Sequence, residues 1–196
     1  DLKPEHISAY TLTLEKGTEL YQFVKKGEVA MPDENQTGEW FLNTLGILNS
    51  HGYPAYEISN FARPGMECRH NLHYWRIHPY LAFGPSAHGF DGRNRWGNVR
   101  SLDQYLTQIE SGNTPISMTD SLIQKNLTNE LIGFGLRLNE GIDLAQIPER
   151  YLNQFNTNLE SAREKWSDVL IICDSSVSLT KKGMIYADAV AVDLML

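Results

Sequence analysis

Cysteine is scarce in this chain of 196 residues: only Cys68 and Cys173 occur, and they stand far apart. Two isolated cysteines cannot make the disulfide framework of a small secreted domain, so we expect a reducing, cytoplasmic location. No apolar run approaches the ~20 residues that a membrane-spanning helix needs. The chain also lacks the basic and apolar opening of a signal peptide. We therefore expect a soluble protein with no transmembrane segment.

Motifs of several enzyme classes are also missing. The sequence contains no His-Glu-x-x-His, no Gly-x-Ser-x-Gly and no dinucleotide-binding fingerprint. The segment Gly-Pro-Ser-Ala-His-Gly at 84–89 is not a phosphate-binding P-loop, because no Lys-Ser or Lys-Thr pair follows its second glycine. It predicts either a tight turn or a loop that brings the backbone and His88 close to a ligand.

Lysine is absent from residues 61–100, although this stretch holds six of the nine arginines and is positively charged within a chain of net charge −7. A positive island in an acidic protein suits a small anionic ligand better than a nucleic acid. Arginines that pair with acids from elsewhere in the fold would explain the island equally well. Residues 116–196 are acidic overall, which argues against phosphate contacts, and we expect no nucleic-acid partner.

The same stretch is rich in histidine and aromatic residues. It holds His70, His73, His78 and His88, and seven of the twenty aromatic residues. Imidazoles can ligate a metal, guanidinium groups can bind carboxylates, and flat rings can stack on a flat ligand. The working site is therefore predicted here. The spacing of Cys68, His70 and His73 could also serve zinc, or Cys68 could be a small apolar residue and the histidines hydrogen-bonding groups.

Residues 1–115 predict an α/β unit. A strand at 6–14, a helix from Asp33 to Gly52 and a strand at 53–58 would form one βαβ step of a parallel sheet. One step cannot make a domain, so we expect a fragment of a longer protein. The missing initiator Met fits a fragment and a processed mature protein equally well. The other expected segments are a helix at 19–26 closed by Gly27, a loop through most of 61–100, a helix at 102–110 and a linker at 112–115.

Residues 116–196 predict a second, mainly helical unit, with the domain boundary near 115. This order of elements resembles a winged-helix module, for which we expect a packing or lid role. The first expected segment is a long helix that is capped by Thr119 or Asp120 and ends at Arg137. A short helix at 142–147, a third helix at 153–165, a hairpin of strands 169–173 and 176–179, and a last helix that begins at Thr180 follow.

Three motifs together resemble a known family. They are Tyr-Glu-Ile-Ser-Asn-Phe-Ala-Arg-Pro-Gly at 56–65, Arg-His-Asn-Leu-His-Tyr-Trp at 69–75 and Gly-Pro-Ser-Ala-His-Gly at 84–89. The chain resembles the oxygen-independent coproporphyrinogen III oxidase-like radical SAM proteins over nearly its whole length. The pattern His-Asn-x-x-Tyr-Trp is typical of the haem chaperone branch. The segment Leu-Thr-Lys-Lys-Gly at 179–183 fits the carboxy-terminal domain of this family.

The resemblance implies the last strands of a partial (β/α) barrel, followed by a helical, winged-helix-like domain. It implies that the parent uses a 4Fe-4S cluster and S-adenosylmethionine (SAM). The three-cysteine cluster motif belongs to the amino-terminal half of the family, so this fragment should hold no cluster ligands and no catalytic residues, and should be inactive alone. The implied function is haem binding and trafficking, with haem or porphyrin and haem-receiving apoproteins as partners. The alternative is oxidative decarboxylation of coproporphyrinogen III to protoporphyrinogen IX.

The resemblance also implies site residues. A haem needs an axial imidazole, apolar walls and cations for its two propionates. His70 is the first expected iron ligand and His73 the second. In the branch of the family that oxidises coproporphyrinogen III, the dehydrogenase branch, positions aligned with His73 and His88 approach a second SAM. The remaining expected haem or porphyrin contacts are His88, Asn71, the walls Tyr74 and Trp75, and the propionate partners Arg69 and Arg76. The residues expected on the SAM side are Tyr10, Leu12 and Thr13.

Overall fold

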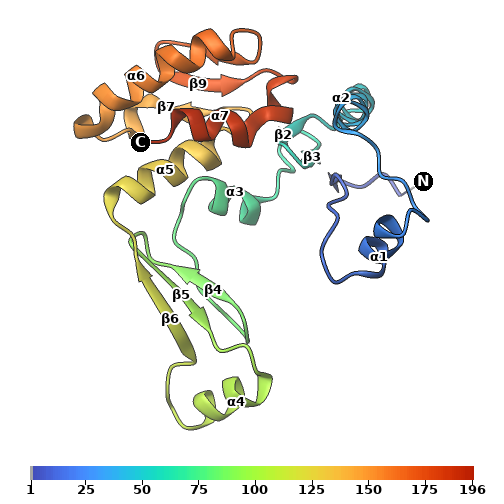
Figure 1. The fold of residues 1–196 in the computed structure, drawn as a ribbon. Helices are drawn as coiled ribbons and strands as arrows, with labels where there is room; N and C mark the ends of the chain where they lie inside the picture. The colour runs from blue at the N-terminus through green and yellow to red at the C-terminus, as the bar shows by residue number, and fades with distance from the viewer. Residues whose placement is uncertain (1) are drawn as a thin grey trace.

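The computed structural model describes residues 2–196. Figure 1 shows an amino-terminal part in blue and cyan, a long arm in green and yellow, and a carboxy-terminal unit in yellow to red. The arm extends away from the other two parts and carries a helix at its free end. No helix within the described residues is long and apolar enough to cross a membrane.

The amino-terminal sheet has three short strands in the order β1 (His6–Ser8), β3 (Asn60–Ala62) and β2 (Ala55–Glu57). β3 is antiparallel to both neighbours. The predicted parallel step between the first two strands is therefore wrong: the chain turns back after β2, and β3 takes the place between them. The first strand also ends at Ser8, well short of residue 14.

Two helices connect β1 to β2, as the sequence predicts. α1 spans Glu19–Lys25, and the Thr18 side chain accepts a hydrogen bond from the backbone N–H of Tyr21. α2 spans Glu34–Ser50, and Asp33 accepts from the N–H of Gln36. Each cap satisfies one of the backbone donors that a helix start leaves unpaired.

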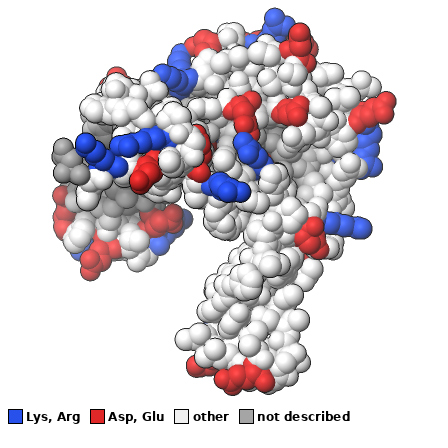
Figure 2. Space-filling view, turned by 180° about the vertical axis from the view of Figure 1, so that it is seen from behind, with Lys and Arg blue, Asp and Glu red and all other residues white. Residues whose placement is uncertain are grey.

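The arm is a three-stranded antiparallel sheet of β4 (His88–Phe90), β5 (Asn94–Asn98) and β6 (Ile116–Ser121). α4 (Leu102–Glu110) lies between β5 and β6 in the chain and at the free end of the arm (Figure 1). Figure 2 shows few charged side chains along the arm and an acidic group at its tip.

The arm agrees with one prediction and corrects another. Residues 61–100 are mainly loop, as predicted, although the short elements β3, α3 (Arg69–Trp75), β4 and β5 fall within or across them. Thr119 and Asp120 do not cap a helix but pair with Trp96 and Arg95 in the sheet. Strand β6 thus connects the segment after residue 115 to the segment before it. The division into domains 1–115 and 116–196 stays a prediction.

An ion pair fastens the base of the arm to the carboxy-terminal unit. Arg95 on β5 donates two hydrogen bonds of 2.8 Å to the carboxylate of Glu130 on α5 (Gln124–Gly135). Burial raises the pKa of Glu130, although Arg95 opposes this shift. The guanidinium carbon of Arg95 also lies 5.2 Å from the centroid of the Phe90 ring.

The carboxy-terminal unit places helices around a sheet in the order β7-β9-β8. Its hairpin is confirmed, as is a cap at Asp143, whose carboxylate accepts from the N–H of Ala145. The long helix begins four residues before the predicted start at 153, and a 3-10 turn precedes the last helix. The elements after α5 are β7 (Ile142–Asp143), the 3-10 turn η1 (Leu144–Gln146), α6 (Glu149–Lys165), β8 (Leu170–Ile172), β9 (Ser176–Leu179), the 3-10 turn η2 (Gly183–Tyr186) and α7 (Ala187–Leu194).

The core lies mostly in this unit, where Phe155, Val177 and Val190 are fully buried. It continues into the amino-terminal part, because Phe61 on β3 belongs to the same cluster. The backbone N–H of Asn139 also donates to the carbonyl of Tyr56 on β2. These contacts fix the short segment between β3 and the arm, and that segment contains α3.

Candidate functional site

Helix α3 carries most of the predicted site residues on one exposed face. Arg69, His70, His73, Tyr74 and Arg76 are exposed. The intervening Asn71, Leu72 and Trp75 are partly buried, as the helical repeat requires. The predicted haem contacts on this segment therefore lie close together but on two sides of one short helix.

Aromatic rings continue from α3 toward the arm. The His70 ring meets the Tyr74 ring edge-on at a centroid distance of 4.9 Å, and Tyr74 meets Tyr80 at 4.5 Å. Tyr80 then lies 6.2 Å from Phe90 on β4. Burial raises the pKa of Tyr80, so its phenol stays protonated. Tyr74 therefore has one side engaged by neighbouring rings.

The inner side of α3 is held by the rest of the fold. Asn71 donates a hydrogen bond of 3.3 Å to the Tyr56 hydroxyl, which also bonds to Nε2 of His6 at 2.9 Å. Burial raises the pKa of Tyr56 against the opposing effect of that hydrogen bond. These contacts give Asn71 a positioning role in the fold, whatever ligand the helix binds.

Trp75 lies against the carboxy-terminal unit. Its ring meets Phe134 at a centroid distance of 5.8 Å, and the guanidinium carbon of Arg137 lies 4.8 Å from its centroid. The indole Nε1 is buried and has no hydrogen-bond acceptor among residues 2–196. A buried N–H without a partner is unusual and is satisfied if a ligand or a water reaches it.

A tight turn ends α3. Ile77 has a φ of 54°, a left-handed conformation that is unusual for a β-branched residue. This turn brings the backbone N–H of His78 to 2.8 Å from the carbonyl oxygen of His73. The two imidazole rings meet edge-on at a centroid distance of 5.1 Å. His78 thus joins the site although the sequence did not single it out.

The arginine island is partly neutralised by acids from elsewhere in the fold. Arg76 donates from Nε and from a terminal nitrogen to the two oxygens of Glu140, at 2.9 and 3.1 Å. Arg95 is paired with Glu130 in the same way. Arg69 has no ion-pair partner within the part of the chain that the structure describes. The pairing explanation is therefore confirmed for Arg76 and Arg95, and the explanation by an anionic ligand stays a prediction.

A cavity of about 760 Å³ separates the end of α3 from the corner between α5 and β7. Trp75 and Arg76 are the predicted residues that line it, and His78 lines it as well. Three histidines within nine residues were the signal in the sequence that could have pointed to His78. The other lining residues are Leu131, Gly135, Leu138, Glu140, Gly141, Asp143, Gln146, Ser175 and Ser176.

The structure does not bring His88 to α3. His88 is exposed on β4 and pairs with Gly97 on β5. A side chain on Gly97 would come within 3.1 Å of Nε2 of His88, so this glycine makes room for the imidazole ring. No ring contact joins His88 to the other histidines in residues 2–196.

The predicted SAM-side residues form a separate group near the amino terminus. Tyr10 and Leu12 line an apolar cavity of about 540 Å³, together with aromatic residues such as Trp40 and Phe41. Tyr10 and Thr13 line a second cavity, of about 1030 Å³, that reaches η2 and α7. Neither of these two cavities is lined by a residue of α3, and the cavity at Trp75 and Arg76 is lined by none of Tyr10, Leu12 and Thr13.

Neither zinc nor an iron–sulfur cluster fits the cysteines of this chain. No three His, Cys, Asp or Glu side chains in residues 2–196 come together as metal ligands, so the zinc hypothesis for Cys68, His70 and His73 is wrong. Cys68 precedes α3, and Cys173 is exposed beyond β8. Two separated thiols cannot supply the three-cysteine motif that the resemblance implies for a cluster.

Comparison with known proteins identifies relatives along almost the whole chain. It is 31% identical to heme chaperone HemW of Bacillus subtilis over 191 residues and 33% identical to HemW of Mycobacterium tuberculosis over 192 residues. These matches cover 96% and 97% of this chain, but 50% and 47% of the relatives. The chain thus spans about half the length of the curated relatives it matches. No family model matches it.

A solved structure shares the fold. Coproporphyrinogen III oxidase (HemN) from Escherichia coli, described as a radical SAM enzyme, superposes with a TM-score of 0.70 at 16% identity. The match covers 99% of this chain and 48% of that enzyme. The fold therefore confirms the predicted radical SAM architecture, while the winged-helix detail stays a prediction. The chain is thus a relative of the heme chaperones HemW along almost its whole length, and it shares its fold with a radical SAM enzyme.

Proposed function

We propose that this chain binds haem on the segment 69–78 and that the whole protein carries haem in the cytoplasm to proteins that need it. The observation that carries the proposal is the set of rings on His70, His73 and His78. None of the three is hydrogen-bonded to another side chain or to the backbone within residues 2–196. Unengaged imidazoles are free to ligate iron. The heme chaperones that match this chain support the same cargo.

The surroundings of these rings suit haem in part. Tyr74 supplies aromatic surface next to the His70 ring, as a flat macrocycle requires, whereas Trp75 packs against Phe134 on the other side of the helix. Arg69 is exposed and without an ion-pair partner in the described part of the chain, so it is the readier partner for a propionate. Arg76 must first leave Glu140. His88 lies on the arm and would contact a porphyrin only if the arm moved or the ligand extended toward it.

We propose that SAM, in the whole protein, lies beside Tyr10, Leu12 and Thr13. The support is the apolar cavity at Tyr10 and Leu12, which suits the flat face of an adenine, and the larger cavity at Thr13, whose lining is mixed. A 4Fe-4S cluster would have to be held by the part of the whole protein outside this chain. Catalysis by this chain alone is not expected.

Titration with ferric haem tests the proposed function. The chain should show a saturable Soret band, and the triple substitution of His70, His73 and His78 by alanine should weaken binding at least about tenfold, since even residues that only support a metal ligand have effects of this size. His51→Ala is the matched control, because His51 ends α2 and its Nδ1 bonds to the Ile47 carbonyl. Equal affinities for all three proteins would contradict the proposal.

The rival function is oxidative decarboxylation of coproporphyrinogen III by the whole protein. The shared fold is compatible with it, but the curated relatives quoted above are named as heme chaperones. The whole protein with its cluster reconstituted should therefore show no SAM-dependent formation of protoporphyrinogen IX. Sustained turnover would favour the enzyme.

A further inference from the structure

We propose that the outer face of α4, at the free end of the arm, is a docking surface for a partner protein that presents apolar side chains next to lysines or arginines. The arm holds α4 away from the other two parts of the chain (Figure 1), so a partner can reach this helix without contacting the segment 69–78. The inference goes beyond the proposed function and does not depend on it, because no haem takes part in the contact.

Three apolar side chains form a stripe along α4. Leu102, Leu106 and Ile109 are spaced by four and three residues, so they lie on one side of the helix. They are 57%, 45% and 50% exposed, and none of them belongs to the core cluster. Tyr105, on the adjacent side, fixes the helix to the arm, because its hydroxyl accepts a hydrogen bond of 3.1 Å from the backbone N–H of Gly84. An amphipathic helix normally buries its apolar stripe, whereas this one faces outward.

Two acidic residues flank one edge of the stripe. Asp103 and Glu110 are seven positions apart, which is about two helical turns, so their carboxylates lie on the same side of α4. Neither belongs to an ion pair in residues 2–196. Asp103 stands in the first turn, where an acid suits the helix dipole, but Glu110 is the last residue of α4, where an acid opposes the dipole. Helix stability therefore does not explain Glu110.

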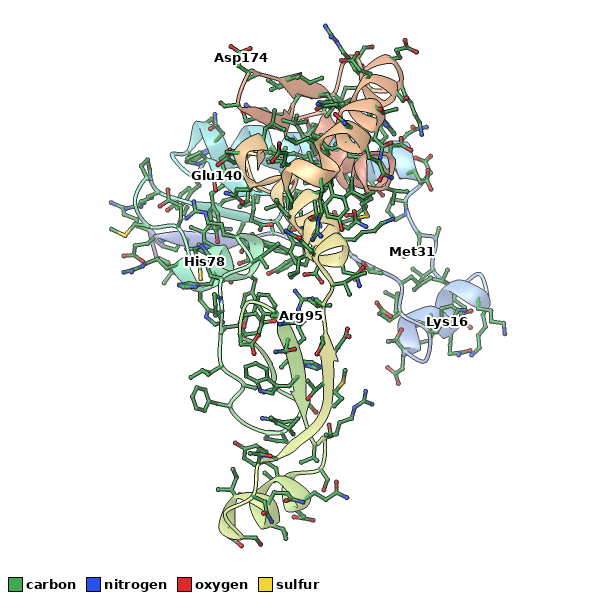
Figure 3. All side chains as sticks on the ribbon, turned by 90° about the vertical axis from the view of Figure 1, so that its left-hand side faces the viewer. Lys16, Met31, His78, Arg95, Glu140 and Asp174 are labelled. Atoms are coloured by element: carbon green, nitrogen blue, oxygen red, sulfur yellow. The ribbon has the colours of Figure 1, made fainter. Side chains whose placement is uncertain are left out.

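The surroundings of α4 leave these acids without a nearby cation along the chain that follows Arg100. Residues 101–124 contain three acids and no lysine or arginine. Arg95, which Figure 3 labels, lies at the base of the arm and is paired with Glu130. The face of the tip in Figure 2 shows acidic side chains only. Because opposite charges select a partner and guide its approach, the protein that covers this stripe should be basic at its edge.

Two other occupants fit the surface less well. Helices that lie on a membrane carry lysines and arginines on their polar face, and α4 has neither. A second copy that docked face to face would bring two pairs of carboxylates together, which costs affinity. An apolar stripe between cations matches both features of α4, in the way that one amphipathic helix packs on another. The nine residues of α4 span only about 14 Å, so this contact should be a transient one.

A synthetic peptide tests the docking surface. The probe is a labelled, helix-forming peptide whose leucines recur every three or four residues and are flanked by lysines, and fluorescence anisotropy gives its affinity for the full chain. The double substitution Leu106→Ser and Ile109→Ser should weaken binding at least about tenfold, because it removes two buried apolar contacts. Added salt should weaken the binding of the unchanged chain.

A charge reversal separates docking from folding. Glu110→Lys should weaken binding roughly threefold or more, although a lysine at this end favours the helix dipole, so unfolding of α4 would not explain the loss. Val192→Ser, at an exposed apolar position of α7, and Glu149→Gln, at an exposed acid of α6, are the matched controls and should bind the peptide like the unchanged chain.

Each contrary result would overturn the proposal. Absence of saturable binding, or binding that the double substitution leaves unchanged, would mean that the stripe does not dock the peptide. Equal binding by Glu110→Lys would refute the basic partner. Self-association of the chain, or its binding to vesicles of anionic phospholipid, would assign the surface to a second copy or to a membrane if the same double substitution abolished it. A whole protein that does not bind the peptide would show that its remaining part covers α4.

Discussion

Replacing Glu130 with alanine tests how strongly burial increases the contribution of an ion pair in this fold. The Arg95–Glu130 pair is bidentate, and its side chains are 28% and 21% exposed. Fully exposed pairs contribute about 0–1 kcal/mol, whereas removing one member of a buried pair costs about 3–5 kcal/mol. Because this pair is partly buried and Arg95 keeps its contact with Phe90, we expect Glu130→Ala to reduce the free energy of unfolding by about 1–3 kcal/mol.

The chain offers a matched control for this prediction. Glu140→Ala removes the same carboxylate from a bidentate pair with Arg76, but the two side chains are about half exposed. Its effect should stay within about 1 kcal/mol. Urea unfolding gives both free energies, and hydrogen exchange should show faster opening of β5 and β6 only in Glu130→Ala. Equal losses in the two variants would refute the argument from burial.

Three further predictions concern the stability of the folded chain. Gly141→Ala should lower the free energy of unfolding, measured in urea, by more than about 2 kcal/mol, because φ is +75° and the new Cβ would collide with the Val177 carbonyl. The control Gly46→Ala lies in the open interior of α2 and should raise the free energy of unfolding by about 0.4–1 kcal/mol. Phe155→Ala, at a fully buried position, should cost about 3–5 kcal/mol in the same assay. Burial raises the pKa of Glu130 above its ordinary value of 4.5, so the folded state binds this proton more tightly than the unfolded state does. The free energy of unfolding should therefore fall as pH rises from 4.5 through the folded-state pKa. Unfolding measured across this pH range should show no such decline in Glu130→Gln.

Local signals predicted the helices well and some strands poorly. Asp33 and Thr18 each cap a helix that begins where the sequence indicated, because a cap depends on residues only three apart. Thr119 and Asp120 are equally good capping residues, yet they lie in β6 because pairing with β5 outweighs their local preference. Strand β3 has three buried residues in succession, so no alternation of polar and apolar residues marks it.

The candidate site was predicted in its chain segment but not in its geometry. Trp75 and Arg76, two of the predicted site residues, line one cavity, while their roles stay predictions. The position of His78 beside His73 could not be predicted, because it follows from a turn at Ile77, whose conformation no local pattern indicates. The ion pair between Arg76 and Glu140 could not be predicted from the sequence either, because the two residues are 64 positions apart in the chain. Such contacts depend on how the carboxy-terminal unit packs against α3.

Transfer of haem to an acceptor tests the central claim of haem carriage most directly. The chain is loaded with one equivalent of ferric haem, freed of excess, and mixed with a haem-free globin, a generic high-affinity acceptor. If the chain holds haem reversibly through an imidazole, its Soret band should be replaced by the spectrum of the acceptor. The replacement should be faster when His70, His73 and His78 are all replaced by alanine. A chain that never loads, or one whose haem never moves to the acceptor, would contradict a role in haem trafficking.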